Sequence, residues 1–293
     1  MGGKHCEKKW LQEQYLDLLR SGPEIAAQVG RTKATVYMQL RKHGIEIRGP
    51  GKAQHLARKN EISIRSYLMS LLEGEVLADG SIAIHPSKMS AYYRHGSKYR
   101  DYLLWLSDEF NEHGLLQSGR IRKRTMKRFS KPGFYEAWHY TSLAYPELVE
   151  VRKRFYPDGK KIVPEDIVLN PVSARQAYIG DGSLSCRKGN HQPHIDLYTC
   201  GFDRMSIEIL MNQLSGHGIR VSYEKSHNSI RISTYSTEDF LSWIAPCPPE
   251  IEHIYGYKWC TSRTGTVAEW QEQYKQQHNT SLEEADRCAF ATI

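Results

Sequence analysis

The stretch LEGEVLADG at residues 72–80 is an apolar segment that ends in Asp-Gly, and a second such segment, ARQAYIGDG, occupies residues 174–182. Their aspartates, Asp79 and Asp181, lie 102 positions apart (181 − 79), about the length of one small domain. Each segment has the apolar content of a helix and precedes residues that alternate as in a strand. Because a single Asp-Gly is only a common turn, the case for a repeat depends on the elements downstream of each copy.

The elements downstream of the two aspartates occur in the same order. The first copy predicts strands at 81–85 and 91–94, a helix at 98–115, strands at 119–129 and 135–141, and a helix at 145–155. The second predicts strands at 184–186 and 195–199, a helix at 203–219, strands at 220–224 and 229–234, and a helix at 237–244. Lys161 follows Asp79 by 82 positions (161 − 79), and Lys258 follows Asp181 by 77 (258 − 181). We therefore predict an α+β fold built from two pseudo-symmetric repeats.

Residues 61–260 resemble the single-chain, double-motif LAGLIDADG homing endonucleases. The first motif matches the family signature closely, whereas the second carries a bulky Gln176 and has Gly180 where many relatives have a second acid. The resemblance implies two αββαββα repeats whose antiparallel sheets form a saddle. The segments YPDGKKIVPEDI (156–167) and IYGYKW (254–259) also look like the family, and its catalytic-centre lysines map to Lys161 and Lys258.

The resemblance implies a Mg²⁺-dependent phosphodiester hydrolase that cleaves a long, non-palindromic double-stranded DNA site, with Mn²⁺ able to substitute. The residues that the resemblance implies to be catalytic are Asp79, Asp181, Lys161 and Lys258. Those that it implies to bind the metal are Asp79, Asp181, Gly80 and Gly182. Two carboxylates at adjoining helix ends repel unless a cation sits between them, and Mg²⁺ prefers oxygen ligands. Small residues at Gly74 and Ala78, and at Ala177 and Gly180, would let the two motif helices approach closely.

The strands after each motif are the predicted DNA-contacting surface, since a β-ribbon fits the major groove. In GRIRKRTMKRF (119–129), arginines occur at every second position, so they share one face of a strand. The candidates are Ser81, His85, Tyr92, Arg94, Arg120, Arg122, Arg124, Lys127, Ser183, Ser185, Arg187, His194, Asp196, Tyr198, Lys225 and Arg231.

Residues 1–48 predict an all-α helix-turn-helix module. A helix is expected at 8–20, and EIAAQVGRTKATVYMQLRKHGI (24–45) resembles the helix-turn-helix of bacterial and phage DNA-binding proteins, with Val36, Met38 and Leu40 expected to face inward. The alternative is a helical hairpin whose charges are merely solvated. The candidate DNA contacts are Arg31, Thr32, Lys33, Thr35, Tyr37 and Gln39, with Arg48 and Lys52 placed along phosphates.

The predicted domains are the helix-turn-helix (1–48), a basic linker (49–60), repeat 1 (61–170), repeat 2 (171–262) and a polar tail (263–293). The excess of 40 Lys+Arg over 33 Asp+Glu gives a net charge of +7, which favours a polyanionic partner. The six cysteines contain no C-x-x-C pair, which disfavours a zinc site. The sequence has no apolar run of membrane-spanning length and no signal-peptide pattern at its start, so we expect a monomeric, intracellular protein.

The sequence leaves two other functions open. One is a transcription regulator that keeps a LAGLIDADG-like fold without cleavage, although such regulators have degenerate acids and the opposite order of modules. The other is an RNA maturase that assists intron splicing, because the family contains both activities.

Overall fold

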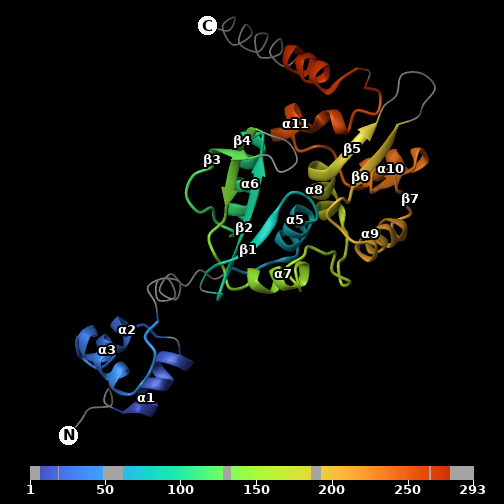
Figure 1. Cartoon of the computed structure of the whole chain (residues 1–293). Helices are drawn as coiled ribbons and strands as arrows, with labels where there is room; N and C mark the ends of the chain where they lie inside the picture. Colours follow the sequence, from blue (N-terminus) through green and yellow to red (C-terminus); the bar gives the residue numbers. More distant parts are fainter. Residues whose placement is uncertain are drawn as a thin grey trace, which may run out of the picture.

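The computed structural model describes residues 7–18, 20–48, 62–86, 88–127, 133–185, 193–263 and 265–277 (Figure 1). Lys52 and Arg187 fall outside these residues. The fold is mixed α+β, as predicted, with two antiparallel four-stranded sheets and helices at the N-terminus. Two separate apolar cores are present in the described residues, one in the N-terminal helices and a larger one in residues 62–254.

The N-terminal helices are α1 (Lys8–Gln12), which continues as the π-helix η2 (Glu13–Asp17), α2 (Gly22–Gln28) and α3 (Lys33–Lys42). Ser21 begins α2 with a capping box, and Thr32 caps α3 by accepting a hydrogen bond from the Thr35 amide. Val36 and Leu40 are buried as predicted, but Met38 is 56% exposed. The inward position expected for Met38 was wrong, because 36 and 40 share a helical face and 38 lies on the opposite side.

The first repeat begins with α5 (Ser66–Leu77), and its sheet has the antiparallel order β1-β2-β4-β3. The strands are β1 (Ser81–Ile84), β2 (Ala91–Ser97), β3 (Arg122–Lys127) and β4 (Phe134–Thr141). Helices α6 (Arg100–Glu112) and α7 (Leu148–Phe155) complete the repeat. Gly114 adopts a φ of +87° just beyond α6, in the left-handed region that favours glycine.

The second repeat has the same order of elements, beginning with α8 (Pro171–Asp181), and the matching sheet order β5-β6-β8-β7. Its strands are β5 (Gly182–Ser185), β6 (His194–Tyr198), β7 (Val221–Glu224) and β8 (Ser229–Ile232). Helix α9 (Arg204–Gly216) lies between the strand pairs, and the 3₁₀ turn η3 (Thr234–Ser236) leads into α10 (Thr237–Trp243). Sequence reasoning missed the next two elements, α11 (Pro249–Tyr255) and the 3₁₀ turn η4 (Gly256–Lys258).

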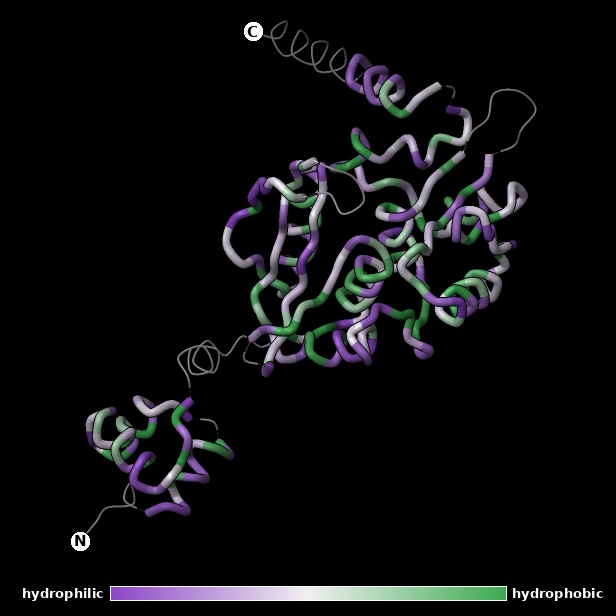
Figure 2. The backbone as a smooth tube through the Cα atoms, in the orientation of Figure 1, coloured by the Kyte–Doolittle hydropathy of each residue, from purple (hydrophilic) through white to green (hydrophobic). Residues whose placement is uncertain are grey.

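Helices α5 and α8 pack against each other at the centre of the molecule, between the two sheets (Figure 1). The contact is close because glycines sit in it. A Cβ on Gly74 would lie 2.7 Å from Cβ of Gln176, and a Cβ on Gly180 would lie less than 3.0 Å from Cβ of Ala78. Leu71, Val76 and Ile179 are fully buried around these helices, which run through the apolar interior of Figure 2.

A further helix at residues 267–277 contacts the end of the second repeat. Trp270 packs on Gly256, Gln271 donates to the Ile254 carbonyl at 3.2 Å, and Tyr274 donates to Glu252 at 3.3 Å. This part of the predicted polar tail is therefore a packed element. Among the described residues, no helix has both the length and the apolarity needed to cross a membrane.

Candidate active site

Asp79 and Asp181 lie at the C-terminal ends of the two packed helices. Asp181 is the last residue of α8, and Asp79 is exposed in the turn after α5. Burial, and after it the charge of Asp79, raises the pKa of Asp181 to about 6. The close approach of Ala78 and Gly180 immediately before the aspartates brings the two carboxylates into one electrostatic centre.

Each predicted lysine binds backbone carbonyls at the end of its own repeat's motif helix. Lys161 Nζ donates to the carbonyls of Ala78 at 2.6 Å and Gly80 at 3.4 Å. Lys258 Nζ donates to the carbonyls of Tyr178 at 3.1 Å and Ile179 at 2.6 Å. Carbonyls at a helix C-terminus lack intrahelical donors, so an ammonium group both satisfies them and opposes the helix dipole.

Burial also perturbs the two lysines. It lowers the pKa of Lys258, which is only 4% exposed, to about 8, and it lowers the pKa of Lys161. In both cases Asp181 and Asp79 act in the opposite direction, favouring the charged ammonium. The structure thus brings all four residues that the sequence singled out as catalytic into one cluster, with each lysine in electrostatic reach of both aspartates.

The donor atoms at this centre suit a hard divalent cation. Two carboxylates, with the backbone oxygens of Gly80 and Gly182 beside them in the chain, offer oxygen ligands, and the raised pKa of Asp181 reflects in part a repulsion that a cation would relieve. No group of three His, Cys, Asp or Glu side chains in the described residues is arranged to hold a metal. A cation here would therefore need water or substrate oxygens to complete its shell.

Comparison with known proteins identifies relatives in sequence and in fold. The LAGLIDADG DNA endonuclease family matches residues 69–240, which is 172 of 293 residues (240 − 69 + 1). The chain belongs to this family. It is 27% identical over 261 residues to the uncharacterized protein MJ1098 of Methanocaldococcus jannaschii, covering 86% of this chain and 98% of that protein. The fold resembles the homing endonuclease I-WcaI bound to its DNA recognition sequence, with a TM-score of 0.58 and 18% identity over 72% of this chain and 94% of that one.

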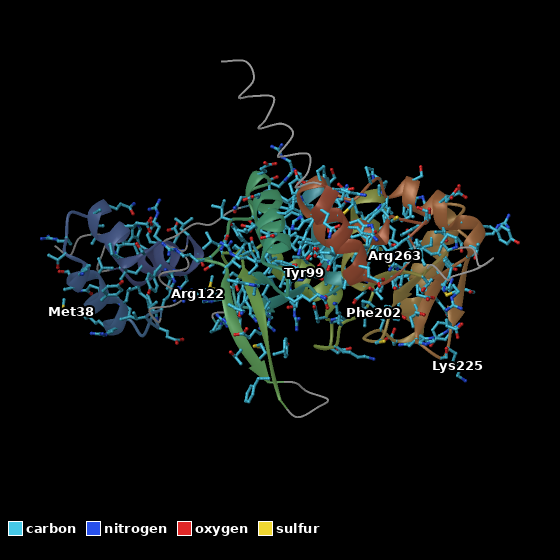
Figure 3. All side chains as sticks on the ribbon, turned by 90° about the horizontal axis from the view of Figure 1, so that it is seen from above. Met38, Tyr99, Arg122, Phe202, Lys225 and Arg263 are labelled. Atoms are coloured by element: carbon cyan, nitrogen blue, oxygen red, sulfur yellow. The ribbon has the colours of Figure 1, made fainter. Side chains whose placement is uncertain are left out.

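In this LAGLIDADG protein, the outer face of the first sheet is lined by cations. The pairing of the strands places five side chains on one face of the sheet: Ser81, Arg94, Arg122, His139 and Thr141. Ile82, Tyr93 and Tyr140 are buried on the other face. The predicted residues on the outer face are Ser81, Tyr92, Arg94, Arg122 and Arg124. Arg120 is exposed just before β3, His85 lies half-buried in the turn after β1, and Lys127 ends β3. Figure 3 shows Arg122 on the hairpin formed by β3 and β4.

The corresponding face of the second sheet carries mixed charge. Asp196 is only 7% exposed, because Arg231 binds it at 2.9 Å and His194 lies 3.5 Å away. Arg231 also binds Glu224 at 3.1 Å. Ser183, Ser185 and Tyr198 complete the predicted residues of this face, and exposed Lys225 lies in the β7–β8 turn (Figure 3). Asp196 and Arg231 were predicted as separate DNA contacts, but the structure pairs them with each other.

The N-terminal candidates divide into exposed and packed residues. Arg31, Thr32 and Lys33 are exposed at the start of α3, while Thr35 and Gln39 are half-buried. Tyr37 packs against α2, where a Cβ on Gly22 would lie 2.5 Å from its ring. The Arg48 guanidinium stacks on the Tyr15 ring at 3.9 Å and donates to the Arg20 carbonyl at 2.9 Å. Tyr37 and Arg48 therefore both make contacts within the module. The stacking of the Arg48 guanidinium on the Tyr15 ring is favourable because a cation is attracted to the face of an aromatic ring.

Sequence reasoning missed a buried polar cluster beside the aspartates. Glu75 is 1% exposed and accepts hydrogen bonds from the hydroxyls of Tyr93 and Tyr102, each at 2.5 Å, and it contacts His95 Nδ1 at 2.9 Å. The available signal was Glu75 itself, an acid within a largely apolar helix, four positions before Asp79. A buried carboxylate requires partners, and strand β2 supplies two of them.

Proposed function

We propose that this protein is a site-specific DNA endonuclease that hydrolyses both strands of a long, non-palindromic target in a divalent-metal-dependent reaction. One observation carries the proposal. Two aspartates at adjoining helix ends are each accompanied by a lysine that donates to helix-end carbonyls, and both aspartates act electrostatically on each lysine. Family membership and the fold shared with a DNA-bound homing endonuclease support the same function.

In the proposed mechanism, Asp79 and Asp181 would hold Mg²⁺, with Mn²⁺ as a substitute, and the carbonyl oxygens of Gly80 and Gly182 would lie beside them. When bound, the ion would supply Lewis-acid stabilisation of phosphate oxygens and a more acidic water. The chain's own residues orient the reacting groups. Lys161 and Lys258 are tethered to helix-end carbonyls, so their positive charge is fixed where negative charge builds up on the scissile phosphates.

The two sheets would hold the duplex. The arginine-lined face of the first sheet would bind phosphates and guanine edges, while the second sheet, with Asp196 and Arg231 already paired, would depend more on serines and on Tyr198. Because the two faces differ in charge and in residues, the preferred target need not be symmetric. One chain holds both repeats, so we propose that a monomer suffices.

The N-terminal module would add a helix-turn-helix contact. Exposed Lys33 is the first residue of α3 and exposed Arg31 lies just before its N-cap, at the end of a recognition helix that contacts bases in such modules. We propose that these residues lengthen the recognised site. Removing residues 1–60 should then weaken binding and shorten the protected region of DNA, with the cleavage chemistry retained.

The test is a cleavage assay on the uninterrupted form of the gene that hosts this reading frame, with Mg²⁺ or Ca²⁺. We expect a specific double-strand cut with Mg²⁺ that is lost in the Asp79→Asn and Asp181→Asn variants. Asp108→Asn, at an exposed carboxylate on α6, is the matched control and should cut normally. Tight, specific binding without a cut in either metal would refute the nuclease and favour a DNA-binding regulator.

A further inference from the structure

The buried cluster around Glu75 belongs to only one half of the molecule. Its carboxylate is held by Tyr93 and His95 from β2 and by Tyr102 from α6. Tyr93 and Tyr102 are at most 2% exposed and His95 is 5% exposed. The Tyr93 hydroxyl also lies 3.0 Å from His95 Nδ1, so the four polar groups form one closed network inside an apolar core.

This network supports the turn that carries Asp79. The Gly80 amide donates to the Glu75 carbonyl at 2.8 Å, and a Cβ on Gly80 would lie 2.7 Å from the Tyr93 hydroxyl. The Glu75 carboxylate also acts on the Lys161 ammonium. The cluster is therefore in direct structural contact with one half of the catalytic centre.

Among the residues that the structure describes, the second repeat has no such network at the equivalent positions. Glu75 and Ala177 both lie four residues before their aspartate, and the cross-strand pairs Ser81↔Arg94 and Ser183↔Asp196 fix the correspondence of the strands after each motif. Helices α6 and α9 begin at Arg100 and Arg204, which makes Ser206 the equivalent of Tyr102. The equivalents of the four polar residues are therefore Ala177, Ile195, Leu197 and Ser206, of which only the serine is polar. Gly182 rests instead against the ring of Tyr178.

We propose that Glu75 and His95 are positioning residues that make the two strand cleavages unequal, so that one DNA strand is cut before the other. The proposal rests on the proposed nuclease function. It follows from the asymmetry of the two repeats, because aspartates supported by different neighbouring residues are held in different geometries. The residues that support the ligands of a metal centre alter activity by about tenfold or more.

The experiment uses the full-length protein and the host-gene DNA with each strand end-labelled separately, so that the two nicking rates are measured in one reaction. Glu75→Gln keeps the shape of the side chain. The double variant Glu75→Ala with His95→Leu copies the residues of the second repeat. Glu73→Gln is the matched control, since Glu73 is a buried acid of the same helix that pairs with Arg154 at 2.8 Å, outside the cluster.

We expect the unaltered protein to cut the two strands at rates that differ severalfold, and the double variant to change that ratio by about tenfold. Glu75→Gln should shift the ratio in the same direction, and Glu73→Gln should leave it unchanged. A purely structural role would lower both rates by the same factor, and that result would overturn the proposal while leaving the nuclease in place. Equal strand rates in the unaltered protein would also overturn it, whereas no cutting at all would refute the nuclease as well.

Discussion

The contact between the two motif helices gives the most direct test of how the centre is built. Gly180 lies in α8 opposite Ala78, and a Cβ at Gly180 would come closer than 3.0 Å to Cβ of Ala78. We predict that Gly180→Ala destabilises the protein. Overpacking of this kind costs about 1–3 kcal/mol, and a gain in helix propensity of about 0.5–1 kcal/mol offsets part of it. The expected net loss is therefore about 1–2 kcal/mol.

The compensating change makes the prediction specific. Ala78→Gly removes the opposing methyl group, so the pair Ala78→Gly with Gly180→Ala should recover most of the lost stability, with a coupling energy of about 1–2 kcal/mol. Gly216→Ala is the matched control, because nothing lies within 4 Å of its added Cβ, and it should be neutral or slightly stabilising.

Urea unfolding of the full-length protein, followed by circular dichroism in EDTA, measures these free energies. Cleavage by Gly180→Ala should also fall, because the shift separates Asp79 from Asp181. If Gly180→Ala were as stable as the unaltered protein, or if Ala78→Gly failed to rescue it, the close helix contact would be refuted.

Three further predictions concern charge. Asp181→Asn should stabilise the metal-free protein at pH 7 by roughly 1–2 kcal/mol, a value reduced for partial exposure. The folded-state pKa of Asp181, about 6, lies above its ordinary value, so the stability that this group contributes is fully present below pH 4 and is lost as pH rises through 6. The result that would contradict this is a melting-temperature difference between Asp181→Asn and the unaltered protein that is the same at pH 4 and at pH 7. Since burial lowers the pKa of Lys258 to about 8, its charge is lost as pH rises through 8, and the cleavage rate should decline there; a pH–rate profile still flat at high pH would exclude that role. Replacing both Arg122 and Arg124 by Ala should reduce the slope of log binding constant against log salt concentration by about 0.9 for each lost phosphate contact. Lys153→Ala on α7 should leave that slope unchanged. If fluorescence anisotropy gave the same slope for the double variant and the unaltered protein, the first sheet would not be part of the DNA interface.

Much of the fold could be predicted because the repeat is recorded in local patterns. Alternation located all eight strands of the described residues, and apolar periodicity located α6, α7, α9 and α10 to within a few residues. The four catalytic candidates are those that the resemblance to the LAGLIDADG family implies, and the matched distances from each aspartate to its lysine agree with it. These four residues lie close together because α5 packs against α8, a contact that the small residues of both motifs predicted.

The remaining features depend on long-range contacts that no local pattern records. Glu75 and His95 are 20 positions apart (95 − 75) in different elements, and only the packing of β2 against α5 joins them. The same holds for Asp196 and Arg231, which are 35 positions apart (231 − 196) and pair with each other across β6 and β8. Local patterns also gave no indication that Trp270 packs on Gly256, because the helix at residues 267–277 is mostly polar, as a solvated tail would be.

The divergence of the second motif has a physical explanation in the helix contact. Gln176 is bulky and Gly180 replaces a larger residue of many relatives, which in isolation suggests decay of the signature. Across the pseudo-twofold axis, however, Gln176 opposes Gly74 and Gly180 opposes Ala78. A contact of each repeat with its own copy would set Gln against Gln, or Ala against Ala, at spacings where even one added Cβ does not fit. The two motifs are complementary to each other rather than to themselves, and that complementarity favours pairing within one chain over assembly of like repeats.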